Sequence, residues 1–150
     1  MNPKYATEFS AGADLCASET VTIEPSQFKI VPTGYIGNHK DYADCGAILL
    51  LARSSLSFKR GLMLGNGCGL IDIDYHDEFK AILFNVTQEP VTVEKGERIV
   101  QLLPIAKDAI ANVPGWQVGR DLRQGGFGST GGYKQVPSFI GVGDIKEFGA

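Results

Sequence analysis

The chain is poor in the residues from which metal centres and disulfide frameworks are built. Its 150 residues include three cysteines and two histidines. Cys16, Cys45 and Cys68 are odd in number and form no C-x-x-C pair, so we expect reduced thiols in a cytosol-like compartment. His39 and His76 lie far apart and lack the closely spaced cysteine partners of a zinc motif. A structural zinc site is therefore not expected.

An excess of basic residues and a long apolar run are also lacking. Lys and Arg number 14 against 17 Asp and Glu, which gives a net charge of −3. Binding to a nucleic-acid backbone normally requires a basic surface. The longest aliphatic run, Ala47–Ala52, is too short to cross a membrane, and the N-terminus has no basic-then-apolar signal. We expect a soluble cytoplasmic protein with neither nucleic acid nor a membrane as partner.

Glycine, by contrast, is abundant, with 19 residues in the chain, well above the usual share of about 7%. Aliphatic residues are plentiful and no triplet period occurs, so the glycines indicate turns rather than collagen or disorder. Short β-rich runs predict an all-β protein with at most one short helix, after Arg53, and Pro32 and Pro104 are expected to end two of the strands. The predicted strands are Val21–Ile23, Phe28–Val31, Gly46–Leu51, Lys80–Val86, Val91–Val93 and Arg98–Leu103.

The segment Gly65–Tyr75 combines glycines, an amide, two carboxylates and an aromatic ring, which suits a small polar ligand. Its glycines let another molecule approach the main chain closely. We expect Leu70 and Ile71 to anchor the segment to a core, and Asp72 and Asp74 to point to the same face of a regular strand. An ordinary glycine-rich hairpin with solvated acids is the alternative interpretation.

A second glycine cluster, Gly125–Gly131, contains a formal Gly-x-Gly-x-x-Gly pattern. Dinucleotide sites need that pattern to open a helix, and no amphipathic helix is predicted here. No Gly-Lys-Ser/Thr follows, so the segment is not a Walker A loop. What remains is a loop with main-chain N–H groups, hydroxyls and one ring, which suits covering a phosphate chain and a base together. A flexible linker is the alternative.

Arg53, Ser54 and Ser55 follow an apolar run and precede a predicted helical turn, so they are expected at the end of a buried strand. A guanidinium, two hydroxyls and the first N–H groups of a helix would converge on one anion, which suits a phosphate. Lys59 and Arg60 are expected on a solvated basic face, because charged side chains are mostly exposed.

Together with Ser10–Leu15 and Glu97–Leu102, these three segments have the order and approximate spacing of the five motifs of the dUTP diphosphatase family. The chain resembles the trimeric dUTPases over Tyr5–Gly131. The resemblance implies a dUTPase domain over residues 1–131, folded as a distorted jelly-roll β-barrel, and a C-terminal extension over residues 132–150. It also implies a homotrimer with active sites shared between subunits.

Members of this family hydrolyse dUTP to dUMP and pyrophosphate, which keeps uracil out of DNA and supplies dUMP for dTMP synthesis. The resemblance implies that Asp72 orients a water for in-line attack on the α-phosphorus, a task that suits a carboxylate with a reference pKa of about 3.9. Gln101 would help to hold that water or a phosphate oxygen, or is a strand amide satisfied by backbone. Asp14 would accept hydrogen bonds from waters on a Mg²⁺ ion chelated by the triphosphate, or is a turn carboxylate.

The resemblance also divides the substrate among the motifs. Tyr75 would pack beneath the deoxyribose and leave no room for a 2′-hydroxyl, and the hairpin Gly65–Lys80 would read uracil with main-chain groups and the Asn66 amide. Phe127 would stack on the base when the fifth motif closes. The implied substrate-binding residues are Arg53, Ser54, Ser55, Asn66, Gly69, Leu70, Ile71, Asp72, Tyr75, Lys80, Gln101, Arg123, Phe127, Gly128, Ser129 and Thr130.

The sequence departs from the family pattern in four places. Ala52 stands where the family usually has Pro. His76 and Asp77 stand where the family usually has Arg-Gly. One residue is lost ahead of the last glycine cluster, so either Arg123 or Arg120 would reach the γ-phosphate. The sequence also begins close to the first motif, and part of Val136–Ile145 is expected to replace the family's leading strand or to form a loosely packed extension.

Two other functions stay open at this point. dCTP deaminases share the expected fold and an Arg-Ser-Ser segment, but Ile82 occupies the position of their catalytic Glu. A nucleotide-binding regulator that holds a protein partner would use the same fold without catalysis.

Overall fold

The computed structural model describes residues 2–109 and residue 115. Within these residues every strand pair is antiparallel and one short α-helix is present, which confirms the predicted all-β class. The elements in chain order are β1 (Lys4–Tyr5), β2 (Ala13–Cys16), β3 (Val21–Ile23), β4 (Phe28–Ile36), the 3-10 helix η1 (His39–Tyr42), β5 (Cys45–Ala52), α1 (Ser54–Arg60), β6 (Leu62–Leu64), β7 (Gly69–Asp72), β8 (Glu78–Asn85), β9 (Val91–Val93), β10 (Arg98–Ala106) and the 3-10 helix η2 (Lys107–Ala109).

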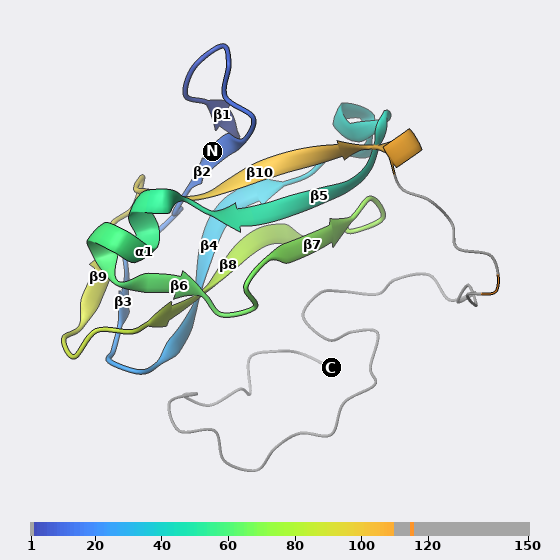
Figure 1. Cartoon of the computed structure of the whole chain (residues 1–150). Coiled ribbons are helices and arrows are strands. Elements are labelled where there is room, and N and C mark those ends of the chain that lie inside the picture. The colour runs from blue at the N-terminus through green and yellow to red at the C-terminus, as the bar shows by residue number, and fades with distance from the viewer. Residues whose placement is uncertain (1, 110–114, 116–150) are drawn as a thin grey trace.

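The strands form three antiparallel sheets. The largest has the order β1-β2-β10-β5-β7, a second has the order β4-β8-β6, and β3 pairs with β9 alone. Figure 1 shows β5 and β10 lying side by side along the molecule, with β4 and β8 in the layer beneath and α1 at the end where β5 finishes. These antiparallel layers agree with a jelly-roll type of fold.

The core lies between the layers and is built by alternation along the strands. In β8, Phe79, Ala81, Leu83 and Asn85 are buried and the residues between them are half-buried, as the two-residue period of a strand requires. The five-stranded sheet contributes the facing residues. The buried apolar cluster is Leu15, Ala17, Ile23, Val31, Ile48, Leu50, Leu56, Leu62, Leu64, Phe79, Ala81, Leu83, Val93, Ile99, Val100 and Leu102.

Helix α1 begins directly after β5 and ends at a glycine. Arg53 is its extended N-cap residue, and Leu56 enters the core. Gly61 ends the helix in the left-handed region at φ 63°, where glycine is favoured because it has no Cβ. Arg60 is half-buried, bonded to the carbonyl of Thr92 and paired with Glu97, so it is only partly solvated, whereas Lys59 is exposed as predicted.

Pro32 and Pro104 do not end their strands. β4 continues past Pro32 to Ile36, and β10 continues past Pro104 to Ala106. β4 is an edge strand of its sheet, and β10 is paired with β2 only as far as Leu102. A proline is tolerated at such positions, because the strand has a side without a partner strand and no N–H is required there.

The segment Gly65–Lys80 is not the hairpin that was predicted. β7 pairs with β5 in the large sheet, whereas β8 pairs with β4 and β6, so the segment crosses from one layer to the other. β7 ends at Asp72 and Asp74 lies in the following turn, so the two acids do not share a strand face. Among the helices of the described part, none is long and apolar enough to cross a membrane.

Candidate active site

A cleft opens beside β7, where the segment Gly65–Lys80 crosses from one layer to the other. Its volume is about 130 Å³, whereas roughly 10–15 Å³ suffices for one water. The lining combines apolar side chains with an amide, a phenol and an amine: Leu50, Asn66, Gly69, Leu70, Ile71, Tyr75, Phe79 and Lys80. All of these except Leu50 and Phe79 belong to the predicted substrate-binding set, so the structure brings this part of the set together.

Tight backbone packing shapes the floor of this cleft. Gly69 lies opposite Leu50 in the register of β5 and β7, and a Cβ on Gly69 would come within 3.1 Å of the Leu50 Cβ. Gly67 turns the chain at φ 71° just before β7, and glycine suits that conformation. Leu70 is 63% exposed, so the prediction that it anchors the segment to the core is wrong and only Ile71 packs there. Adjacent strand residues face opposite sides, so the sheet cannot bury both.

The ring of Tyr75 is held in place beside the cleft. Its hydroxyl donates a hydrogen bond to the Glu78 carbonyl at 3.0 Å, and its backbone N–H donates to the Asp72 carbonyl at 3.1 Å. The second bond closes a turn immediately after β7. Asp72 and Tyr75 therefore keep a fixed relation to each other, with the carboxylate exposed and the ring half-buried.

Asp14, Gln101 and Asp72 lie on one face of the five-stranded sheet. Gln101 is opposite Asp14 on one side and Leu51 on the other, and Asp72 is opposite Ala47. Residues directly opposite each other share a face, as do alternate residues of one strand. This face is turned away from the core, so it can meet a ligand or a second copy of the chain.

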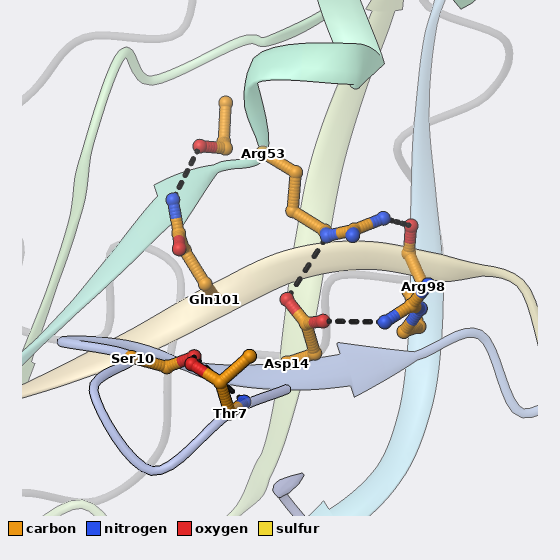
Figure 2. A network of polar contacts seen from close by, with 7 residues as sticks. Thr7, Ser10, Asp14, Arg53, Arg98 and Gln101 are labelled. Carbon is orange, nitrogen blue, oxygen red and sulfur yellow. Dashed lines mark hydrogen bonds and ion pairs between the residues drawn. The ribbon is translucent and has the colours of Figure 1, made fainter. Parts of the chain in front are cut away.

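Figure 2 shows a charged cluster on that face, around Asp14. One Asp14 oxygen pairs with Arg53 Nε at 2.9 Å and the other with Arg98 Nη1 at 3.2 Å. Arg53 Nη1 also donates to the Arg98 carbonyl at 3.2 Å. Asp14 is only 8% exposed, whereas both arginines reach solvent. Two guanidinium charges against one carboxylate leave the cluster net positive, which favours an anion.

Gln101 extends the cluster along β10. Its Nε2 donates to the Ala52 carbonyl at 3.1 Å, next to Arg53. The other side of its side chain packs on Gly12, where an added Cβ would lie 3.0 Å from Gln101 Oε1. The amide is thus partly satisfied by backbone, as the alternative interpretation expected, and its oxygen faces the loop that precedes β2.

The described residues offer no protein cage for Mg²⁺. No group of three or more His, Cys, Asp or Glu side chains gathers among residues 2–109 and 115. Both oxygens of Asp14 are already paired with guanidinium groups. Such a donor set fits an ion that rests on substrate phosphates and meets Asp14 through water, because Mg²⁺ retains several waters in sites of that kind.

The two parts of the predicted site lie at opposite ends of β5 within one copy of the chain. Asp72 is opposite Ala47, and Arg53 follows Ala47 by six residues. At about 3.3 Å per strand residue, the separation along the sheet is roughly 20 Å. Gln101, opposite Leu51, is about 13 Å from Asp72 in the same direction by the same measure. Asp72 and Gln101 of one copy are therefore too far apart to hold the same water.

Two residues of these clusters were not assigned by sequence reasoning. Arg98 stands in the fourth motif beside a strongly apolar run, and an irregular strand pairing between Arg98 and Val100 directs it to Asp14. Phe79 is one of the buried residues of β8. Its position between the charged residues Glu78 and Lys80 was the sequence pattern that could have indicated its burial. Ser54 and Ser55, at the start of α1, lie beside Arg53 as predicted.

The predicted residues of the fifth motif lie outside the described part of the chain: Arg120, Arg123, Phe127, Gly128, Ser129 and Thr130. The same holds for the extension over residues 132–150 and the strand proposed within it. These assignments stay predictions.

Ile82 bears on the deaminase alternative. It belongs to β8, and its side chain packs against Gly65. A Cβ added to Gly65 would lie 2.9 Å from Ile82 Cγ2. This half-buried aliphatic side chain supplies no proton-transferring carboxylate, so deaminase chemistry has no acid at that position.

Comparison with known proteins places these features in one family. A family model described as dUTPase matches residues 1–131. The chain is 44% identical over 138 residues to deoxyuridine 5'-triphosphate nucleotidohydrolase of Neisseria meningitidis serogroup B, covering 87% of this chain and 88% of that protein. It is 42% identical over 136 residues to the protein of the same name from Idiomarina loihiensis, covering 86% of each.

A solved structure agrees with the sequence relatives. The crystal structure of dUTPase from Streptococcus mutans matches with a TM-score of 0.63 and 34% identity, covering 69% of this chain and 84% of that one. The chain belongs to the dUTPase family, a family of hydrolase enzymes. The predicted family and the predicted enzymatic class are confirmed.

Proposed function

We propose that the protein hydrolyses dUTP to dUMP and pyrophosphate with an active site assembled from more than one copy of the chain. The observation that carries the proposal is the cleft beside β7, which joins the Asn66 amide, the Tyr75 ring and Lys80 next to the exposed Asp72 carboxylate. The positive Asp14, Arg53 and Arg98 cluster supplies the complementary site for a phosphate chain.

The cleft suits a nucleoside. Uracil carries two carbonyl acceptors on either side of one N–H donor, and the backbone of an irregular segment can match that pattern with its own donors and acceptors. Asn66 adds an amide with both kinds of group. Tyr75 would lie beneath the deoxyribose, where its half-buried ring leaves no room for a 2′-hydroxyl. Lys80, which also lines the cleft, would approach the sugar or the first phosphate.

Asp72 would be the catalytic base. Its carboxylate accepts a hydrogen bond from a water, whose oxygen forms a bond to the α-phosphorus while the bond to the oxygen bridging the β-phosphorus breaks. Pyrophosphate leaves with the bridging oxygen, and the proton of the water passes to Asp72. Gln101 of another copy would orient the same water or a phosphate oxygen through its amide.

The phosphates would meet Arg53, Ser54 and Ser55, with Arg98 supporting Arg53 through their shared partner Asp14. Mg²⁺ would arrive on the triphosphate and reduce its charge. Asp14 would accept hydrogen bonds from waters of that ion. Phe127, Gly128, Ser129 and Thr130 would close over the substrate, and Arg123 or Arg120 would reach the γ-phosphate; closure would exclude water from the site.

A shared site resolves the separation of about 20 Å between Asp72 and Arg53 along one sheet. A second copy would bring its own Arg53 to the Asp72 of the first. Leu49, Leu51 and Leu70 lie on the same outward face and are half-buried or exposed, so they offer the apolar contact that such an assembly needs. A closed ring of three copies is the homotrimer that the resemblance implies.

Pyrophosphate release tests the reaction directly. Purified protein is offered dUTP, UTP, dCTP and dTTP in turn, with Mg²⁺ and with excess chelator. We expect rapid release from dUTP with Mg²⁺ and much slower release in every other reaction. Equal rates with dUTP and dTTP, or no release from dUTP, would contradict the proposal.

Subunit mixing tests the shared site. Arg53→Gln and Asp72→Asn are each expected to be nearly inactive, and we mix them after mild dissociation and reassembly. If a site takes Asp72 from one copy and Arg53 from its neighbour, about a quarter of the sites in a random equimolar mixture contain both native residues. Recovery toward that fraction supports the shared site. A mixture as inactive as its components places both residues in one copy.

A further inference from the structure

A row of aromatic rings runs from the cleft into the interior of the second layer. Tyr75 and Phe79 have ring centroids 5.9 Å apart at an interplanar angle of 42°. Phe79 and Tyr35 follow at 5.3 Å in an edge-to-face arrangement at 89°. Such ring contacts are attractive beyond their buried area, because the edge of one ring complements the face of another. Tyr75 is thus the outermost member of a connected set.

Phe79 is the fixed member of this row. It is 2% exposed, and it lies directly opposite Tyr35 in the register of β4 and β8. Gly37 closes the far side, since a Cβ there would lie 3.0 Å from Phe79 Cζ and 2.9 Å from Tyr42 Cε2. The ring therefore has a backbone behind it and Tyr75 in front of it, and it also lines the cleft.

Tyr35 is in turn fastened at its outer end. Its hydroxyl is hydrogen-bonded to that of Tyr42, the last residue of η1. Burial and the hydrogen bond to Tyr35 raise the pKa of the Tyr42 hydroxyl well above its ordinary value, so this group stays neutral throughout the physiological range. The Tyr42 hydroxyl consequently keeps its proton for this hydrogen bond at neutral pH.

We propose that Phe79, backed by Tyr35, is a positioning residue that sets how strictly the cleft rejects a ribonucleotide. The inference rests on the proposed function, in which the Tyr75 ring fills the space that a 2′-hydroxyl would need. Tyr75 can exclude that hydroxyl only while its ring cannot move inward. Phe79 occupies the space into which the ring would move, so a smaller side chain there gives Tyr75 freedom and the ribose hydroxyl room.

The test compares the selectivity for dUTP over UTP, expressed as the ratio of their kcat/KM values, in the wild type and Phe79→Leu. We expect the ratio to fall tenfold or more in Phe79→Leu, mainly through a higher relative rate with UTP. A purely structural role would lower both rates together and leave the ratio unchanged. A ratio within twofold of the wild-type value would overturn the inference.

Phe84→Leu is the matched control. Phe84 lies on the same strand, its ring pairs with Phe28 at 4.5 Å, and neither of these two rings lines the cleft. The control is expected to keep the dUTP over UTP ratio within twofold even if the protein becomes less stable. An equal fall of the ratio in Phe84→Leu would overturn the inference, because it would show a general effect of loosening β8.

Tyr35→Leu keeps the inference testable if Phe79→Leu does not fold. Tyr35 is half-buried and does not line the cleft, so its loss is tolerated more easily. We expect a smaller fall of the ratio in the same direction, and an unchanged ratio in a folded Tyr35→Leu protein would overturn the inference. Absence of dUTP hydrolysis by the wild type would instead overturn the proposed function, and the inference with it, before any variant is compared.

Discussion

Replacing Gly61 by alanine should destabilise the protein through two separable effects. Gly61 ends α1 at φ 63°, a conformation that costs an L-residue about 1–2 kcal/mol. An added Cβ would also lie well inside van der Waals contact with Thr87 Cγ2, and such overpacking costs about 1–3 kcal/mol. The backbone cannot move away, since Gly61 N–H donates to Ser57 and Val86 N–H donates to the Gly61 carbonyl, each at 3.0 Å. The combined loss is about 2–5 kcal/mol.

Thr87→Ser separates the two effects, because it removes the methyl group and keeps the hydroxyl that bonds to Asn85 and Glu89. In that background Gly61→Ala should cost only the backbone term of about 1–2 kcal/mol. Urea unfolding gives the free energies. Thermal unfolding should show a Tm lower by about 2–4 °C for each kcal/mol, measured at one protein concentration because assembly raises apparent stability.

Two results would refute this reasoning. A Gly61→Ala protein as stable as the wild type would mean that the end of α1 is not constrained as described. If Gly61→Ala lowers the free energy of unfolding equally in the wild type and in Thr87→Ser, the methyl contact contributes nothing and the backbone conformation alone is responsible.

Three further predictions concern the site and its support. Asp72→Asn should reduce turnover of dUTP by about 10²-fold or more while its affinity changes by less than about tenfold, and equal turnover in single-turnover kinetics would remove Asp72 from the mechanism. Incubation with dCTP should release no ammonia, because Ile82 supplies no carboxylate; ammonia release would restore the deaminase reading. Asn85→Ala should lower the free energy of unfolding by about 2–5 kcal/mol, because buried Asn85 bonds to Ile23, Thr87 and Glu89, and a loss below about 1 kcal/mol in urea unfolding would contradict that role.

The strands were predictable because their residues alternate between the core and the outer face. β3 and β9 begin and end where the apolar and β-branched runs do. The ends of β4 and β10 were not predictable, because a proline interrupts a strand only where its missing N–H would have donated to a neighbouring strand. Which neighbours a strand has is a property of the sheet and not of the local sequence.

The site was predictable in its residues but not in its arrangement. Glycines, an amide and acids close together indicate a ligand segment, and most of the cleft lining follows from it. The crossing from β7 to β8 between two layers depends on long-range pairing, which no local pattern records. For the same reason the sequence could not show that Arg98 shares Asp14 with Arg53, or that Phe79 lies behind Tyr75.

β5 lies between β10 and β7 and leads straight into Arg53, so both halves of the site depend on its length. Inserting one residue between Cys45 and Leu50 would exchange the two faces of the strand beyond that point. Leu50 would leave the cleft and Arg53 would turn away from Asp14 in the same event. Loops elsewhere can lengthen without this effect. Natural or engineered length variation in this protein should therefore fall outside β5, because the length of this strand fixes both Leu50 at the cleft and Arg53 beside Asp14.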